Sequence, residues 1–233
     1  EILNDEENNI VFKTLKNLKN NKHVIVDVEN YSQLNKFALV IKKLTKQKKF
    51  LFRTAASFIS SISEKKSVPK VETFFSNLRI RNKEKSFLPG LIIVGSYVEL
   101  STIQLKNLLE ISNCNPIELD VFEFFKITSS ENNHKQRNLF KNKFLKEIRF
   151  SFEKGKTPVL FTSRKFMSLD YSEQLNFYNS LAFFIAELVA DLKYEIGYLI
   201  SKGGITTNVI LSNGLNADYV YLEGQIFKGI SVV

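Results

Sequence analysis

Hydrophobic residues in the first quarter of the chain alternate between helical spacing and short continuous runs. The helical spacing predicts helices at residues 10–20, 31–46 and 55–62. The short apolar runs between them predict strands at residues 22–28 and 50–53. Because strand and helix alternate, this part of the sequence predicts a parallel sheet that is covered by helices.

A second series of the same kind follows a weakly patterned stretch at residues 63–90, in which 71–78 predicts one short helix. Its predicted strands are 91–94, 117–121, 158–162, 196–200 and 219–222. Its predicted helices are 102–111, 137–153, 172–193 and 206–215. We therefore expect an α/β fold of mostly parallel sheets flanked by helices. Its two domains would be residues 1–66 and 91–233, joined by a linker at 67–90.

The helix predicted at residues 172–193 has the clearest pattern. Asp170 precedes it and Glu173 follows three residues later, which is the spacing of a capping box. Its apolar stripe comprises Leu175, Tyr178, Leu181, Ala182, Ile185, Leu188 and Leu192, broadened by Phe183 and Phe184. An aromatic-rich stripe at helical spacing is typical of a helix packed on a sheet, so we assign this stripe to the core and give it no chemistry.

Two glycine turns each follow a predicted strand and precede a predicted helix. One is Gly95-Ser96, ahead of Ser101-Thr102, and the other is Lys202–Thr207, with Gly203, Gly204, Ile205 and Thr206. Glycine lets backbone N–H groups approach an anion closely, and helix N-termini favour negative charge. The pair indicates a bound nucleotide or phosphorylated ligand, with both strands ending at one edge of the sheet. The alternative is two tight turns with ordinary helix caps.

Charged side chains near strand ends are further candidates. Arg164 follows the strand at 158–162, where open α/β sheets place ligand contacts, although a surface arginine fits the pattern equally well. Arg53 follows Phe50–Phe52, at the end of the predicted strand, and could bind a carboxylate through two hydrogen bonds. Lys202 could offset phosphate charge or simply be solvated. We assign His23 and His134 no catalytic role, and we identify no catalytic base and no metal ligand.

Composition narrows the function classes. The formal net charge is +9, but the lysines are spread along the polar sides of predicted helices and no nucleic-acid-binding motif is present, so we expect no nucleic-acid partner. No apolar run approaches the ~20 residues of a membrane span, so we expect no membrane contact. The single cysteine, Cys114, excludes an internal disulfide and favours a cytoplasmic protein. The sequence leaves open whether the protein forms a homodimer.

Several segments, taken in order, resemble the four-carbon acid sugar kinase family. Those similar to its C-terminal nucleotide-binding domain are Leu91–Val98 with Ser101–Leu105, Thr162–Arg164, Lys202–Thr207 and Gly224–Gly229. Upstream, Arg53–Phe58 resembles the closing part of the family's N-terminal, sugar-binding domain. The resemblance therefore covers most of residues 22–229.

This resemblance implies ATP-dependent phosphorylation of a four-carbon acid sugar such as threonate or erythronate, with ATP and Mg²⁺ as cofactors. The nucleotide-binding residues that it implies are Gly95, Ser96, Ser101, Thr102, Gly203, Gly204, Ile205, Thr206 and Gly229. Arg53 would contact the sugar acid, and residues 1–66 would be the tail of the sugar-binding domain.

The chain also departs from the family pattern. It has no counterpart of the family's Asp-Asp-x-Thr-Gly motif or of its Gly-Asn-x-Gly segment, and Val98 stands where many members have a second serine. We therefore expect a two-domain kinase fragment that supplies mainly the nucleotide-binding part. The alternative is a non-catalytic nucleotide-binding or interaction module of the same fold. A dinucleotide-dependent dehydrogenase is disfavoured, because no G-x-G-x-x-G follows a strand.

Overall fold

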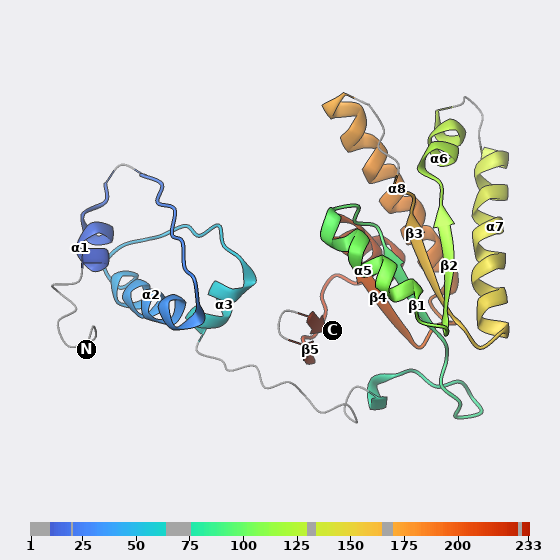
Figure 1. Ribbon diagram of the computed structural model, residues 1–233, viewed down its shortest axis with the longest axis horizontal. Helices are drawn as coiled ribbons and strands as arrows, with labels where there is room; N and C mark the ends of the chain where they lie inside the picture. Colours follow the sequence, from blue (N-terminus) through green and yellow to red (C-terminus); the bar gives the residue numbers. More distant parts are fainter. Residues whose placement is uncertain (1–9, 20, 64–75, 130–133, 165–169, 228–229) are drawn as a thin grey trace. The chain divides into compact units, whose positions relative to one another are not determined.

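The computed structural model describes residues 10–19, 21–63, 76–129, 134–164, 170–227 and 230–233. The chain divides into two compact units. Thr73–Val220 forms one unit, and Glu1–Glu72 together with Tyr221–Val233 forms the other. Each is described by itself (Figure 1).

The larger unit is built on a four-stranded sheet. Its strands are β1 (Gly90–Val94), β2 (Cys114–Leu119), β3 (Thr157–Thr162) and β4 (Tyr198–Lys202). They lie in the order β2-β3-β1-β4, and all neighbouring pairs are parallel. Parallel strands need crossover connections, and helices supply them here. This arrangement confirms the α/β class with a parallel sheet flanked by helices.

The helices of this unit follow the strands in alternation. They are α5 (Glu99–Leu109), α6 (Val121–Thr128), α7 (His134–Glu153), α8 (Tyr171–Leu192) and α9 (Gly204–Val209), which continues as a π-helix, η2 (Ile210–Gly214). Sequence patterning predicted α9 and η2 as one helix and did not predict α6. Helix α6 begins where the Asp120 side chain accepts hydrogen bonds from the backbone N–H groups of Phe122 and Glu123.

Alternating residues of β1 face two separate apolar clusters. Leu91 and Ile93 belong to the large core, which also contains buried side chains of α6, α7, α8 and η2. Ile92 and Val94 face the other way and pack with Leu105 of α5. The sheet is therefore covered on both faces, as its continuous apolar strands require.

Helix α8 is the central helix of the large core. Asp170 caps it in a complete capping box with Glu173. By length and composition Ser172–Leu192 is also apolar enough to cross a membrane, and half of that stretch (50%) is buried inside the protein. The expectation that no apolar run approaches the length of a membrane span is thus wrong for this helix. Its apolar surface is wide because it is a core helix that packs on the sheet.

The cap of α8 predicts a dependence of stability on pH. A hydrogen bond from the Glu173 backbone, then one from the Ser172 hydroxyl, lowers the pKa of Asp170 below its ordinary value. The charged cap should therefore stabilise the fold fully above about pH 4, the ordinary aspartate pKa, and its contribution should disappear as the pH falls through the lowered value. Asp170→Asn retains a good capping residue without the charge. Melting temperatures of both proteins from pH 2 to 6 should converge at the acidic end, and a constant difference would contradict the prediction.

The segment that precedes β1 is held to the rest of its unit by backbone hydrogen bonds. The backbone N–H of Ile80 donates to the Gly197 carbonyl, and the N–H of Gly197 donates to the Pro89 carbonyl. The N–H of Leu88 donates to the Ile80 carbonyl. A Cβ on Gly197 would lie 2.6 Å from the Leu88 carbonyl oxygen, so this approach requires glycine. Of the short helix predicted at 71–78, residues 71–75 lie outside the described residues and 76–78 are helical.

The smaller unit contains three helices, α1 (Ile10–Asn17), α2 (Tyr31–Leu44) and α3 (Ala56–Ser63). They share a small core that includes Phe12, Leu15, Ala38, Ile41, Leu44 and Phe58. The strands predicted at 22–28 and 50–53 are wrong, because both segments lack strand pairing. A strand exists only when a neighbour satisfies its backbone, and two short strands make no stable sheet by themselves.

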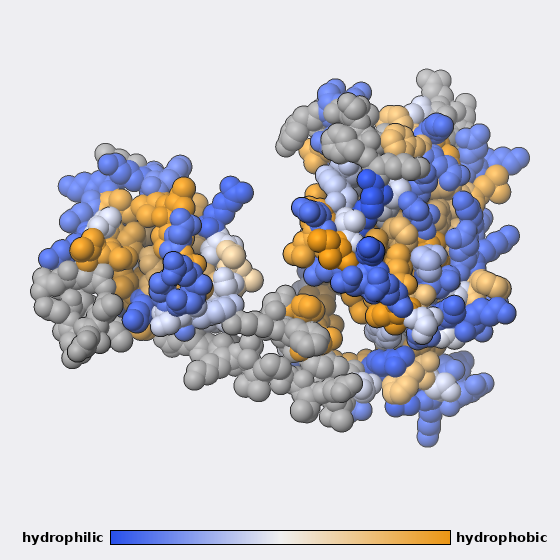
Figure 2. Space-filling model, viewed as in Figure 1, coloured by the Kyte–Doolittle hydropathy of each residue, from blue (hydrophilic) through white to orange (hydrophobic). Residues whose placement is uncertain are grey.

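Most apolar side chains of those two segments remain at the surface, although Phe50 packs against the small core. Ile25 is 88% exposed and Leu51 is fully exposed. Figure 2 shows apolar residues gathered on the visible face of this unit, among hydrophilic ones.

The strand predicted at 219–222 is also wrong: the strand lies later, at β5 (Gly224–Phe227), and pairs antiparallel with β6 (Ile230–Val232).

Candidate functional site

The two glycine turns lie side by side at the carboxyl edge of the sheet. β1 and β4 are parallel neighbours with Val94 opposite Lys202, and the Gly95 N–H donates to the Lys202 carbonyl at 3.0 Å. The expectation that both strands end at the same edge is therefore confirmed. In open α/β sheets this edge is where ligands bind.

The turns are in contact through their glycines. A Cβ on Gly95 would lie 2.1 Å from the hydroxyl oxygen of Thr206, at the start of α9. Gly203 has φ +120°, a backbone conformation that favours glycine, and a Cβ there would lie 3.2 Å from the Ser96 nitrogen. A Cβ on Gly204 would instead meet no atom within 4 Å. Packing thus requires glycine at position 95 and the backbone conformation favours it at position 203, whereas Gly204 borders open space.

Hydroxyl groups and one cation surround the first turn. The buried Ser101 hydroxyl donates to the Ser96 hydroxyl at 3.1 Å. Arg164 donates from Nη1 to the Ser96 carbonyl. The Thr102 hydroxyl donates to the Val98 carbonyl at 3.3 Å, within the first turn of α5. Ser96 is therefore held from both sides, while Thr102 bonds back to the carbonyl of Val98, the N-cap residue of its own helix.

A pocket of about 300 Å³ lies at these turns. Its lining from the turns comprises Gly95, Ser96, Tyr97, Val98, Gly203, Gly204, Ile205 and Thr206. Thr162 at the end of β3 and Gln174, Leu175, Tyr178, Leu181, Ala182 and Ile185 of α8 complete it. The wall from α8 is mostly apolar and the wall from the turns is mostly backbone and hydroxyl. Such a pocket suits a ligand with one apolar and one anionic part.

Sequence reasoning missed the α8 wall. It assigned Leu175, Tyr178 and their neighbours to the core, yet part of that stripe lines the pocket. Tyr97 stacks on Tyr178 with ring centroids 5.2 Å apart and an interplanar angle of 19°. Burial raises the pKa of the Tyr178 hydroxyl, and Tyr97 adds to the effect. The position of Tyr97 directly after Gly95-Ser96 was the available signal for a pocket aromatic.

The other residues that the sequence predicted for the site either do not line this pocket or fall outside the described residues. Ser101 and Thr102 do not line it, although Ser101 bonds Ser96, which does. Arg53 is exposed, without regular structure, in the smaller unit. Gly229 lies outside the described residues. His23 and His134 are exposed. In the described part of the chain, no group of three His, Cys, Asp or Glu side chains is placed to hold a metal ion.

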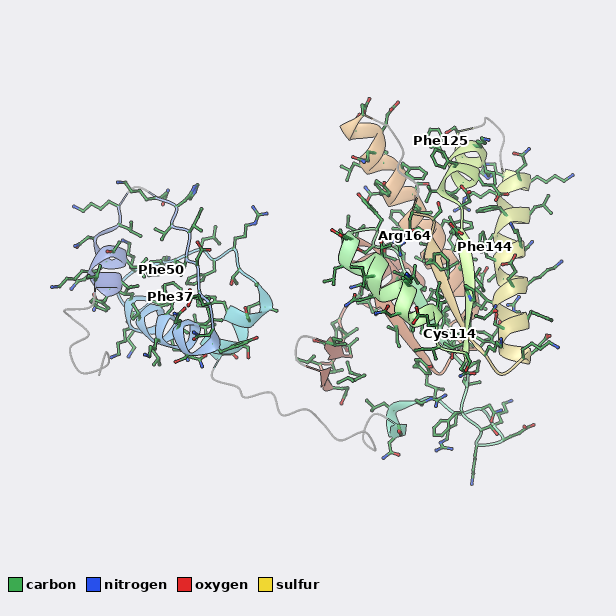
Figure 3. The ribbon with its side chains drawn as sticks, viewed as in Figure 1. Phe37, Phe50, Cys114, Phe125, Phe144 and Arg164 are labelled. Carbon is green, nitrogen blue, oxygen red and sulfur yellow. The ribbon has the colours of Figure 1, made fainter. Side chains whose placement is uncertain are left out.

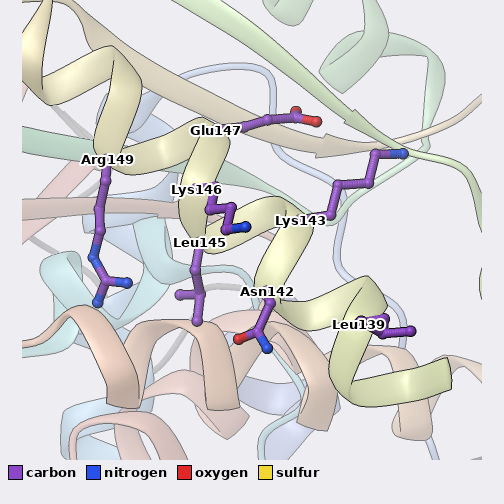
Figure 4. A pocket seen from close by; sticks show the side chains of 7 residues that line it. All are labelled: Leu139, Asn142, Lys143, Leu145, Lys146, Glu147 and Arg149. Atoms are coloured by element: carbon purple, nitrogen blue, oxygen red, sulfur yellow. The ribbon is translucent and has the colours of Figure 1, made fainter. Parts of the chain in front are cut away.

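A larger hollow, about 520 Å³, lies along α7 and offers less chemistry (Figure 4). All its lining residues belong to that one helix, including Asn142, Lys146 and Arg149. Arg149 is already held by Glu195 in an ion pair with a nitrogen–oxygen distance of 2.6 Å. Arg137 and Lys141 likewise pair with acidic residues of α8. The hollow is thus a groove on a solvated helix, and the pocket at the glycine turns is the candidate site.

The comparison with protein families identifies the family of the region that contains this pocket. The model of the nucleotide-binding C-terminal domain family matches residues 91–233. The chain belongs to this family. It is the domain type that the resemblance to four-carbon acid sugar kinases implied. No match was found among curated proteins or among solved structures.

The pocket fits what a nucleotide-binding C-terminal domain must hold. Gly95 and Gly203 line the pocket without side chains, so backbone atoms of both turns form part of its wall. The apolar α8 wall suits a base, and the turns suit phosphates. The matched region begins after residue 90, so the assignment of residues 1–66 to a sugar-binding domain stays a prediction.

Proposed function

We propose that this chain binds ATP and supplies the nucleotide-binding part of a kinase that phosphorylates a four-carbon acid sugar. The observation that most supports the proposal is the contact between the two glycine turns, Gly95-Ser96 and Gly203-Gly204, inside the region of the family match. The order of the sequence motifs supports the sugar acid as the class of substrate. Phosphoryl transfer depends mainly on positioning and charge stabilisation, so a rigid cradle is the part that this domain should provide.

Each part of ATP has a matching wall. Backbone N–H groups of Gly203 and Gly204 would bind phosphate oxygens, with the Ser96 hydroxyl as an additional donor. Gly95 would form the adjoining wall, because its own N–H is bonded to the Lys202 carbonyl. The base would pack on Ile205 and the α8 wall. Mg²⁺ is usually bound through substrate phosphates, one or two carboxylates and water rather than by a full protein cage, and we assign no residue of this chain to it.

A second candidate is a non-catalytic nucleotide-binding or interaction module. The observation that favours it is the pocket lining, which contains no carboxylate among the described residues. A kinase needs a residue that orients or deprotonates the acceptor hydroxyl. If the working protein has no such residue, it would bind the nucleotide but would not transfer its phosphoryl group.

Two measurements separate these candidates. ATP and ADP should raise the melting temperature of the protein in proportion to the logarithm of ligand concentration above Kd, because they bind only the folded state. Four-carbon sugar acids added with ATP and Mg²⁺ should then release ADP. Stabilisation by ATP without ADP release in any four-carbon acid would favour the non-catalytic module, and absence of both effects would contradict nucleotide binding.

A further inference from the structure

Arg164 has an unusual set of hydrogen-bond partners. It follows β3 in the sheet unit, where it is labelled in Figure 3. Nη1 donates to the Ser96 carbonyl, but Nε and Nη2 are buried and have no hydrogen-bond partner in the described part of the chain. Buried donors are almost always paired, so two on one side chain require an explanation.

The two unpaired nitrogens are the ones that bind an oxyanion. The N–H groups on Nε and Nη2 lie parallel along one edge of the guanidinium and match two oxygens of a carboxylate or phosphate. Arg149 shows the filled version in the same protein, because its Nε and Nη2 donate to Glu195 at 3.0 Å and 2.6 Å. In Arg164 the same edge is shielded from solvent and makes no hydrogen bond to the described residues.

The charge of Arg164 is also uncompensated. Among the described residues no carboxylate forms an ion pair with it. Burial lowers the pKa of its guanidinium, and the more distant charge of Glu118 opposes that effect. Arg164 is half-buried, but its shielded Nε and Nη2 lack partners and so destabilise the fold, which a bound anion would stabilise.

We propose that Arg164 binds a phosphate group of the nucleotide through Nε and Nη2, and that the protein alone is less stable because these two nitrogens have no hydrogen-bond partner. The inference rests on the proposed nucleotide function. Phosphate is the anion we expect because the same side chain holds the carbonyl of Ser96, a residue of the glycine turn that lines the pocket. Both nitrogens are shielded from solvent in the free protein, so the guanidinium must turn toward that pocket on binding.

The test compares Arg164→Met with Arg149→Met, the same substitution at the filled pair. Calorimetric titration with ATP, tripolyphosphate and adenosine is combined with melting of the ligand-free proteins. Arg164→Met should lower the affinity for ATP and for tripolyphosphate on the order of 10- to 100-fold, the usual cost of losing hydrogen bonds to a charged group. The affinity for adenosine should be unchanged. The ligand-free melting temperature of Arg164→Met should rise by about 2–4 °C. Arg149→Met should leave all three affinities unchanged and should not raise the melting temperature.

Arg164→Lys keeps the charge but lacks the two-pronged edge, so its loss of ATP affinity should lie between those of wild type and Arg164→Met. Three results for Arg164→Met would overturn the Arg164 proposal alone: unchanged ATP affinity, a lower melting temperature than the wild type, or a loss of adenosine affinity equal to the loss of ATP affinity. If the wild-type protein bound neither ATP nor tripolyphosphate, the proposed function would fail, and the role of Arg164 with it.

Discussion

Gly204→Val is expected to weaken ATP binding on the order of 10- to 100-fold while the protein stays folded. Gly204 lines the pocket, and a Cβ at this position meets no protein atom within 4 Å. The fold can therefore accept the side chain. A phosphate cannot, because a branched side chain would occupy the space through which it reaches the backbone N–H groups.

The matched control is Asn208→Val, which places the same side chain on an exposed position of α9 outside the pocket lining. Titration with ATP and thermal melting of both variants separate binding from stability. Both should melt close to the wild type, and only Gly204→Val should lose affinity. A folded Gly204→Val protein with wild-type ATP affinity would contradict phosphate binding at this turn.

The pattern of apolar residues predicted the parallel sheet because its two central strands, β1 and β3, are buried on both faces. β1 and β3 are continuous apolar runs between polar turns, and such runs occur where helices cover both sides. The runs at 22–28, 50–53 and 219–222 have similar composition but no strand pairing. Composition expresses a preference for strand, whereas pairing depends on a neighbour that local sequence does not reveal.

The site shows the same division between local and long-range information. Strand–glycine–helix order predicted Gly95 and Gly203, because a turn at the end of a parallel strand is a local feature. The wall from Tyr178 and Leu175 was missed, because an apolar stripe is the same whether it faces core or pocket. The position of Arg164 was predicted, but its burial and its two unpaired nitrogens depend on packing by segments far apart in sequence.

Gly95→Ala is expected to destabilise the fold by about 1–3 kcal/mol, the usual cost of overpacking. The new Cβ would lie 2.1 Å from the Thr206 hydroxyl and 2.9 Å from its Cβ. Thr206 is buried and β-branched at the start of α9, so it has few other rotamers.

Thr206→Ala removes the hydroxyl and methyl groups that would clash and is the natural partner for a double-mutant cycle. Denaturant unfolding of wild type, both single variants and the double variant should show a favourable coupling, with the double variant more stable than the sum of the single losses predicts. Strict additivity would mean that the two turns do not touch. Because the cycle measures stability alone, it tests the contact between the two turns independently of any ligand.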